Sequence, residues 1–107
     1  MFTASYPQSE PMRAELDASR GVVVVEFGAS WCGICQAAQP EIKAALSDHP
    51  DVEHLKVFDG PGKPLGRSFG IKLWPTLVAL RDGREVGRLV RPSSRTDIQK
   101  LLTAASA

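Results

Sequence analysis

Apolar residues in the first half of the chain form one continuous run followed by one helical pattern. The run GVVVVEF at 21–27 is rich in β-branched side chains and does not alternate with polar ones, which is typical of a strand buried on both faces of a parallel or mixed sheet. It predicts a central strand. After it, apolar side chains recur at helical spacing and predict an amphipathic helix, which Pro40 kinks because proline removes an amide donor and clashes with the preceding turn. The apolar face of this helix consists of Ile34, Ala38, Ile42, Ala45 and Leu46.

The pattern in the second half predicts a strand, a loop, a hairpin and a closing helix. VEHLKVF at 52–58 is the strand, and the glycines and prolines of 59–68 leave room for one helical turn at most. Two apolar runs flank Asp82-Gly83, a dipeptide that adopts the tight type I′ turn of a β-hairpin. Ser94 and Asp97 resemble a capping box and predict a C-terminal helix.

The chain before the first strand predicts less regular structure. PMRAELDASRG at 11–21 is expected to form a short helix with Gly21 as its C-cap, and residues 2–5 a brief edge strand. The elements thus alternate between helix and strand and end in a hairpin and a helix. This order favours an α/β fold in which helices flank a central mixed sheet. Since the 107 residues contain neither a repeat nor a linker, we expect a single domain over residues 1–107.

Composition and charge exclude some classes of function. No apolar run approaches the roughly 20 residues that cross a bilayer, so we expect no membrane association. The first 11 residues lack the basic start and apolar stretch of a secretory signal, so we expect a cytoplasmic protein unless a periplasmic signal has been trimmed. Residues 56–107 carry ten basic and four acidic side chains. Because the basic residues are scattered without interleaved aromatic ones, they indicate a solvated face and no nucleic-acid partner.

The two cysteines, Cys32 and Cys35, lie three positions apart in WCGICQ, directly after the first predicted strand. A structural disulfide is a poor explanation, because closing a four-residue loop removes only about 1.9 kcal/mol of unfolded-state entropy, against about 3 kcal/mol for 15 residues. Zinc is a closer rival, since the cysteines with His49 and His54 match a two-Cys two-His spacing. Such a site needs an unbroken helix that carries both histidines, and Pro50 separates them. We therefore expect no metal and two exposed histidines.

Reversible dithiol chemistry follows from where the cysteines stand. A strand that ends in a turn and starts a helix exposes Cys32 at the helix N-terminus, where free amides and the macrodipole favour a thiolate. Cys32 is the predicted nucleophile. Cys35, one turn inside the helix, is shielded but within reach of the Cys32 sulfur, so it is the predicted resolving thiol. It attacks the mixed disulfide between Cys32 and a substrate, and leaves a Cys32–Cys35 disulfide.

The chain resembles the thioredoxin family over most of its length. The similar segments are VVVEFGASWCGIC, the helical Pro40, GIKLWPT at 70–76 and LRDGREV at 80–86. The resemblance implies a thioredoxin-like fold and a general protein-disulfide reductase, with disulfide-containing proteins as substrates and a thioredoxin-reductase-like flavoprotein as electron donor. It also implies a monomer whose redox centre is the Cys32–Cys35 disulfide, without a bound cofactor.

The resemblance implies further site residues around the cysteines. Pro75 would be cis and would place the backbone of Trp74 beside the thiols, where it pairs with an extended substrate segment. Trp31, Gly33 and Ile34 would complete the substrate-binding surface. The alternative interpretations are a packed aromatic for Trp31 and a plain surface aromatic for Trp74.

Glu26 is the most informative charged residue. A carboxylate inside VVVVEF lies either at the solvent-exposed end of the strand or buried within it. The resemblance places Glu26 where the family has a buried aspartate, and implies that it accepts the proton of Cys35 through water. Lys56 resembles the nearby lysine that tunes this acid.

The chain departs from the family pattern in three respects. Ile34 replaces the usual proline between the cysteines, and variation there shifts the balance between reduced and oxidised forms. Gly28 stands where the family often has tryptophan, and the short segment before the first strand predicts an abbreviated sheet edge. The alternative functions are a thiol oxidase or isomerase with a less reducing potential, and a non-catalytic adaptor with a thioredoxin fold.

Overall fold

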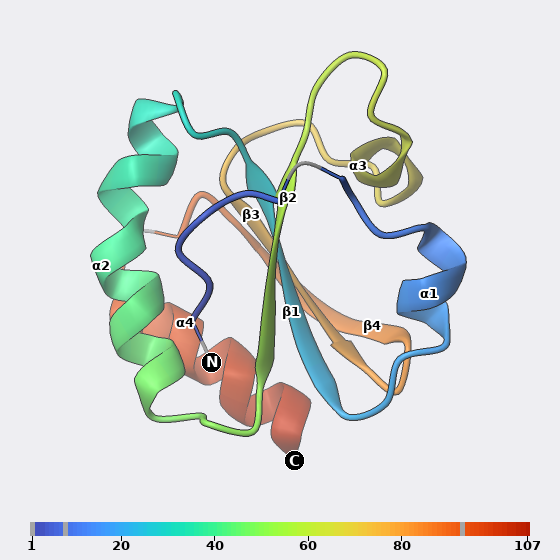
Figure 1. The fold of residues 1–107 in the computed structure, drawn as a ribbon. Helices are drawn as coiled ribbons and strands as arrows, with labels where there is room; N and C mark the ends of the chain where they lie inside the picture. The colour runs from blue at the N-terminus through green and yellow to red at the C-terminus, as the bar shows by residue number, and fades with distance from the viewer. Residues whose placement is uncertain (1, 8, 93) are drawn as a thin grey trace.

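The computed structural model describes residues 2–7, 9–92 and 94–107, and these contain helices and strands in the order that the sequence predicts. Figure 1 shows the helices on both sides of a central sheet. The elements are α1 (Arg13–Asp17), β1 (Val22–Gly28), α2 (Gly33–Ser47), β2 (Glu53–Phe58), α3 (Pro64–Ser68), β3 (Thr76–Arg81), β4 (Arg84–Val90) and α4 (Arg95–Ser106). No helix in these ranges has the length and apolar character needed to cross a bilayer.

Strand β1 is central, as predicted from its continuous apolar run. The sheet order is β2-β1-β3-β4, in which β1 pairs parallel with β2 and antiparallel with β3. Six of the seven β1 residues are buried, because neighbouring strands lie on both sides and helices cover both faces. The predicted mixed sheet is therefore confirmed. The Cys32–Cys35 segment follows directly from the end of this buried strand.

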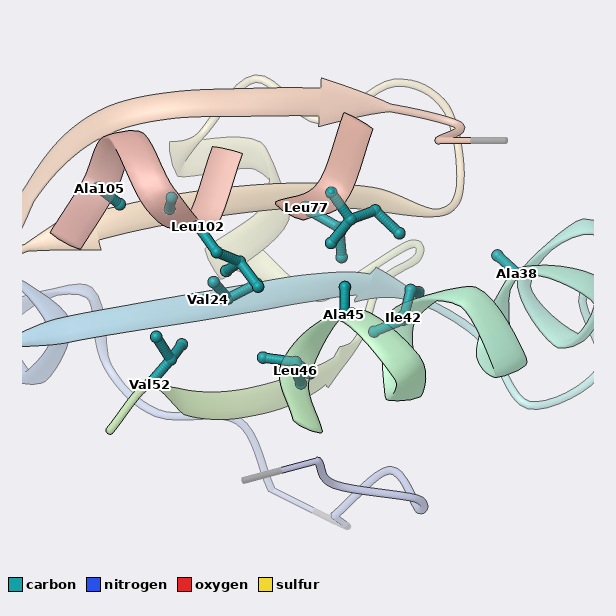
Figure 2. Close-up of a cluster of buried hydrophobic side chains, with 11 residues drawn as sticks. Val24, Ala38, Ile42, Ala45, Leu46, Val52, Leu77, Leu102 and Ala105 are labelled. Atoms are coloured by element: carbon teal, nitrogen blue, oxygen red, sulfur yellow. The ribbon is translucent and has the colours of Figure 1, made fainter. Parts of the chain in front are cut away.

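Apolar side chains fill the space on each face of the sheet. Helices α2 and α4 pack on one face, where Figure 2 shows Ile42 and Leu102 pointing toward the strands. This cluster contains Val24, Ala38, Ile42, Ala45, Leu46, Val52, Leu77, Ala79, Ile98, Leu102 and Ala105. On the other face, Leu16 of α1 and Leu65 of α3 pack in a second cluster around Phe27. The side chains of β1 alternate between the two clusters, as strand geometry requires.

The hairpin and the C-terminal helix form as their turn and cap residues predict. Asp82 and Gly83 have φ angles of 50° and 81°, the left-handed values that a type I′ turn needs. The Ser94 side chain accepts a hydrogen bond from the Asp97 backbone N–H at 3.2 Å and so caps α4.

Two predictions about the N-terminal region are wrong. Helix α1 ends at Asp17 with Ala18 as its C-cap. Gly21, with φ 73°, instead joins the hairpin turn, since its N–H donates to Asp82 Oδ1 at 2.8 Å. Residues 2–5 form no strand but lie across β2, where the Thr3 hydroxyl donates to the His54 carbonyl at 2.6 Å.

The first turn of α2 also differs from the prediction. The helical pattern places Ile34 on the buried face, yet its side chain is 48% exposed. Cys35 occupies the buried place instead. The reason is that α2 begins at Gly33, so its first turn lies at the end of the sheet and only one side of it is covered.

Candidate active site at the start of helix α2

The two cysteines lie at the junction between β1 and α2. Cys32 is the N-cap of α2 and is partly exposed, whereas Cys35 in the first turn is 2% exposed. The Cys35 backbone N–H donates to Cys32 Sγ at 3.2 Å, and both cysteines are free. The first amides of a helix have no partner within it, so a sulfur at this position receives donors that suit an anion. The predicted contrast between an accessible first thiol and a shielded second thiol is confirmed.

Burial sets the chemistry of the second thiol. Burial raises the pKa of the Cys35 thiol to about 11, and its hydrogen bond with Cys32 acts in the same direction. Cys35 therefore carries its proton at neutral pH. A reaction in which Cys35 acts as a nucleophile must first move that proton elsewhere.

Glu26 has a completely buried side chain in β1, so the interpretation of a solvated carboxylate is wrong. Its Oε1 is 2.8 Å from His54 Nε2, and its Oε2 accepts a hydrogen bond from Gln39 Nε2 at 2.8 Å. The backbone N–H of Thr3 donates to His54 Nδ1 at 2.8 Å, so the ring hydrogen must be on Nε2 and points to Glu26. Both carboxylate oxygens thus have a donor, which a buried carboxylate needs.

Lys56 is connected to Glu26 by hydrogen bonds through the side chain of Gln39. The buried Lys56 Nζ donates to Gln39 Oε1 at 2.8 Å and to the Ala4 carbonyl at 3.1 Å. The amide nitrogen of Gln39 also donates to the Cys35 carbonyl at 2.9 Å. Gln39 therefore connects the carboxylate, the ammonium group and the backbone of the buried cysteine. The sequence pattern alone indicated no role for Gln39.

The prediction that His54 is exposed is wrong, because its side chain is 2% exposed. Strand alternation places His54 on the same face of β2 as Lys56, next to the face of β1 that carries Glu26. The alternation along β2 could therefore have predicted that His54 faces Glu26. The prediction failed because the N-terminal segment covers this face, where the Phe2 ring stacks on the imidazole with centroids 5.3 Å apart.

The predicted cis bond between Trp74 and Pro75 is confirmed. Trp31 is 68% exposed, so the interpretation of a packed core aromatic is wrong. Its ring meets the Trp74 ring edge-on, with centroids 5.4 Å apart. The orientation of the Trp74 ring is fixed, because its Nε1 donates a hydrogen bond to Asp59 Oδ2 at 2.8 Å. Trp31 directly precedes Cys32 and the exposed Ile34 directly precedes Cys35, so both place apolar surface next to the thiols, and Trp74 extends that surface through its contact with Trp31.

Arg91 is a residue of this surface that the sequence analysis missed. Its backbone N–H donates to the Pro75 carbonyl at 2.7 Å, and its Nε donates to the Trp74 carbonyl at 2.9 Å. It has a φ of 51°, an uncommon value for a residue other than glycine. These contacts hold the segment that contains the cis bond. A contact between positions this far apart in the chain leaves no local signal in the sequence.

The zinc pattern does not come together. In the ranges that the structure describes, no three His, Cys, Asp or Glu side chains are close enough to hold a metal ion. Both ring nitrogens of His54 are occupied by Thr3 and Glu26. The spacing of Cys32, Cys35 and the two histidines is therefore a coincidence of sequence.

A dithiol at a helix start, on a mixed sheet and with a cis-proline elsewhere in the chain, defines the class of thiol–disulfide oxidoreductases with a thioredoxin fold. The model of the thioredoxin family matches residues 5–104, so the chain belongs to this family. It is a thioredoxin-type protein-disulfide reductase with a CxxC active site.

Individual relatives agree with this assignment. The structure of reduced thioredoxin 2 from Pseudomonas aeruginosa PAO1 is 52% identical, covers 98% of this chain and 97% of that one, and superposes with a TM-score of 0.87. A mutant thioredoxin from Halobacterium salinarum NRC-1 is 28% identical, with 99% and 97% coverage and a TM-score of 0.76. The thioredoxin of Chlamydia muridarum is 36% identical over 84 residues, which are 78% of this chain and 81% of that protein.

Proposed function

We propose that Cys32 attacks the disulfide of a protein substrate and that Cys35 resolves the product. In the first step the Cys32 thiolate forms a bond to one substrate sulfur, and the other sulfur leaves with the electron pair and takes up a proton. In the second step Cys35 attacks Cys32, forms the Cys32–Cys35 disulfide and releases the second substrate thiol. The substrate gains two electrons and the dithiol loses two. The observation that carries this proposal is the partly exposed Cys32 at the N-cap with a buried thiol one turn away.

Glu26 is the proton acceptor for Cys35 in this mechanism. The raised pKa of Cys35 makes such an acceptor necessary at neutral pH. Gln39 contacts both the Glu26 carboxylate and the Cys35 carbonyl. A hollow of about 400 Å³, lined in part by Cys35, Gln39 and Lys56, leaves room for water next to the thiol and next to Gln39, the residue that contacts Glu26. Lys56 orients Gln39 and so tunes the acid indirectly.

The substrate segment lies in an extended form beside the cis-proline. The backbone of Trp74 before Pro75 pairs with it, while Trp31, Gly33 and Ile34 contact its side chains. The exposure of Trp31 and Ile34 supports this assignment, because large apolar side chains at a surface mark sites of protein contact.

The remaining assignments follow from the family. Disulfide-containing proteins are the substrates, and a thioredoxin-reductase-like flavoprotein returns two electrons per turnover to the Cys32–Cys35 disulfide. We further propose that the protein acts as a monomeric single domain in the cytoplasm, a compartment in which thiols are kept reduced.

Insulin reduction by the wild type, Cys32→Ser and Cys35→Ser tests the proposal. We expect activity in the wild type alone, and we expect Cys35→Ser to accumulate a mixed disulfide with insulin, because it can attack but cannot resolve. Wild-type activity no greater than that of Cys32→Ser would reject the reductase and favour the adaptor. A redox titration separates the other alternative, since a potential near about −180 mV rather than about −270 mV would indicate an isomerase.

The role of Glu26 needs a separate test. Glu26→Gln keeps the shape of the side chain but cannot accept a proton. We expect resolution of the mixed disulfide to slow by about 100-fold, while the initial attack by Cys32 is unchanged. An equal loss in both steps would show that Glu26 only supports the structure.

A further inference from the structure

The hydroxyl group of Tyr6 is buried next to the resolving thiol. Residues 2–7 run between α2 and β2, toward the end of the sheet at which α2 begins, and then cross β2 (Figure 1), and the Tyr6 side chain lines the same hollow as Cys35. Within the described residues, no group meets full hydrogen-bond geometry with the buried Tyr6 Oη, and the Cys35 side chain is the hydrogen-bonding group near enough to raise the pKa of Tyr6. A buried hydroxyl without a partner is unfavourable, so this one calls for a functional explanation.

Gly28 brings the hydroxyl and the thiol together. A Cβ atom built on Gly28 would lie 2.8 Å from Cys35 Sγ and 2.8 Å from Tyr6 Oη. Both atoms therefore occupy the space that a side chain at position 28 would fill. The glycine at this position, where the family often has tryptophan, leaves that space to a side chain from the N-terminal segment.

The Tyr6 ring is held in place without any use of its hydroxyl group. Lys56 Nζ lies 4.5 Å from the ring centroid in a cation–π contact, and it is itself fixed by the Ala4 carbonyl and by Gln39. Burial raises the pKa of Tyr6 well above its usual range, and the charges of Glu26, Cys35 and Cys32 act in the same direction. The phenol therefore keeps its hydrogen at every pH at which the protein works. It can share that hydrogen in a hydrogen bond but does not transfer it to another group.

We propose that the Tyr6 hydroxyl donates a hydrogen bond to Cys35 Sγ when that sulfur becomes a thiolate. This rests on the proposed function and adds a residue to its second step. Cys35 gives its proton to the acceptor, and the thiolate is stabilised by the Tyr6 O–H while its electron pair attacks Cys32 Sγ. The bond between Cys32 and the substrate then breaks, and the substrate sulfur leaves with the electron pair. Tyr6 keeps its proton throughout.

The charged and titratable groups around Cys35 come from four parts of the structure. Cys32 lies at the start of the same helix, Glu26 on β1, Lys56 on β2 and Tyr6 on the N-terminal segment. Of these, Cys32 and Glu26 raise the pKa of Cys35. A neutral O–H donor beside the sulfur opposes them, because a hydrogen bond to the charged form favours that form.

Tyr6→Phe removes the hydroxyl and keeps the ring over Lys56. We expect the pKa of Cys35, followed by NMR of labelled cysteine in the reduced protein, to rise by about one unit. Release of 5-thio-2-nitrobenzoate from a mixed disulfide on Cys32 is expected to slow about tenfold at pH 7.5. Attack by Cys32 on an added disulfide should be unchanged. Ser5→Ala, the neighbouring position in the same hollow, is the matched control and should change none of these values.

A second experiment is expected to shift the pKa of Cys35 in the opposite direction. Tyr6 is the one tyrosine of the chain, so growth on 3-fluorotyrosine labels this position alone. The fluorinated phenol is a stronger donor, and we expect it to lower the pKa of Cys35 and to speed resolution. A purely structural role for Tyr6 would not produce opposite shifts in the two proteins.

Either of two results would overturn the proposal: an unchanged or lowered Cys35 pKa in Tyr6→Phe, or equal resolution rates in the wild type and the fluorinated protein. The titrations use the reduced protein without substrate. They therefore give an answer even if insulin reduction fails, so the failure of the reductase mechanism and the failure of the Tyr6 assignment can be told apart.

Discussion

His54 Nε2 lies 2.8 Å from Oε1 of Glu26, and neither side chain is exposed. The contact joins adjacent strands, since Glu26 is in β1 and His54 in β2. Gln39 of α2 donates a hydrogen bond to the other oxygen of the Glu26 carboxylate, and Thr3 of the N-terminal segment orients the imidazole. Four parts of the chain thus meet around one buried acid, which links the stability of the fold to the chemistry of the site.

His54→Phe is expected to destabilise the protein by about 3 kcal/mol, because it leaves one oxygen of the buried Glu26 carboxylate without a donor. Phenylalanine keeps the ring that stacks on Phe2, so the lost hydrogen bonds dominate the effect. Urea denaturation measures the change. His49→Phe, at a half-buried position after α2, is the matched control and should stay within about 0.5 kcal/mol of the wild type. A His54 variant as stable as this control would contradict the account of the Glu26 contact.

The raised pKa of Cys35 predicts a loss of stability in alkali. The native thiol titrates near 11 and the unfolded thiol near 9.0, so the unfolded state releases its proton first as the pH rises. The stabilising contribution of the neutral buried thiol is complete below pH 9.0 and disappears between 9.0 and 11. We expect the reduced wild type to lose stability relative to Cys35→Ala over this interval, as measured by urea denaturation at several pH values. A constant difference between the two proteins would show that the Cys35 pKa is not raised.

Local patterns were sufficient for most of the fold. The valines of β1, the Asp82-Gly83 turn and the Ser94 cap act on neighbouring residues, so the sequence around them predicts their structure. The cysteines could be assigned for the same reason, because a helix start determines the exposure of Cys32.

Contacts between distant positions could not be predicted. The Thr3 and His54 partners are 51 positions apart, and only their packing shows that the histidine is buried. Gly28 could be recognised as a departure from the family, but its consequence depends on Tyr6, which arrives from a segment without regular secondary structure.

Gly66→Ala is expected to destabilise the protein by about 1–3 kcal/mol. Replacement of a helical glycine by alanine is ordinarily favourable by about 0.8–1 kcal/mol, and Gly66 lies in α3. Here the added Cβ would overlap the carboxylate of Asp59, which accepts the hydrogen bond from Trp74. Urea denaturation measures the stability, and tryptophan fluorescence reports the displacement of the indole.

Gly33→Ala provides the comparison for Gly66→Ala. A Cβ at Gly33 would meet no atom within 4 Å. We expect this variant to be as stable as the wild type or slightly more stable, since alanine favours the helix. If both variants were stabilised, the packing of Asp59 against Gly66 would be looser than the structure indicates.

Ile34→Pro is expected to make the dithiol more reducing. Ile34 is the second residue of α2, where proline is tolerated because the amide has no partner within the helix. The substitution removes one N–H group from the first turn of the helix, where unpaired amides and the helix dipole favour a thiolate at Cys32, and so raises the free energy of the reduced form. A loss of about 0.3–1 kcal/mol corresponds to a fall in potential of about 6–20 mV for this two-electron couple.

Equilibration of each variant with glutathione measures that shift in potential, and Ile34→Ala is the matched control. Alanine keeps the N–H but removes most of a side chain that is 48% exposed beside the thiols. Its potential should equal that of the wild type, while its KM for insulin rises because apolar contact with the substrate is lost. A potential that rises in Ile34→Pro, or that falls equally in both variants, would mean that the side chain of Ile34 and not its backbone amide sets the balance between dithiol and disulfide.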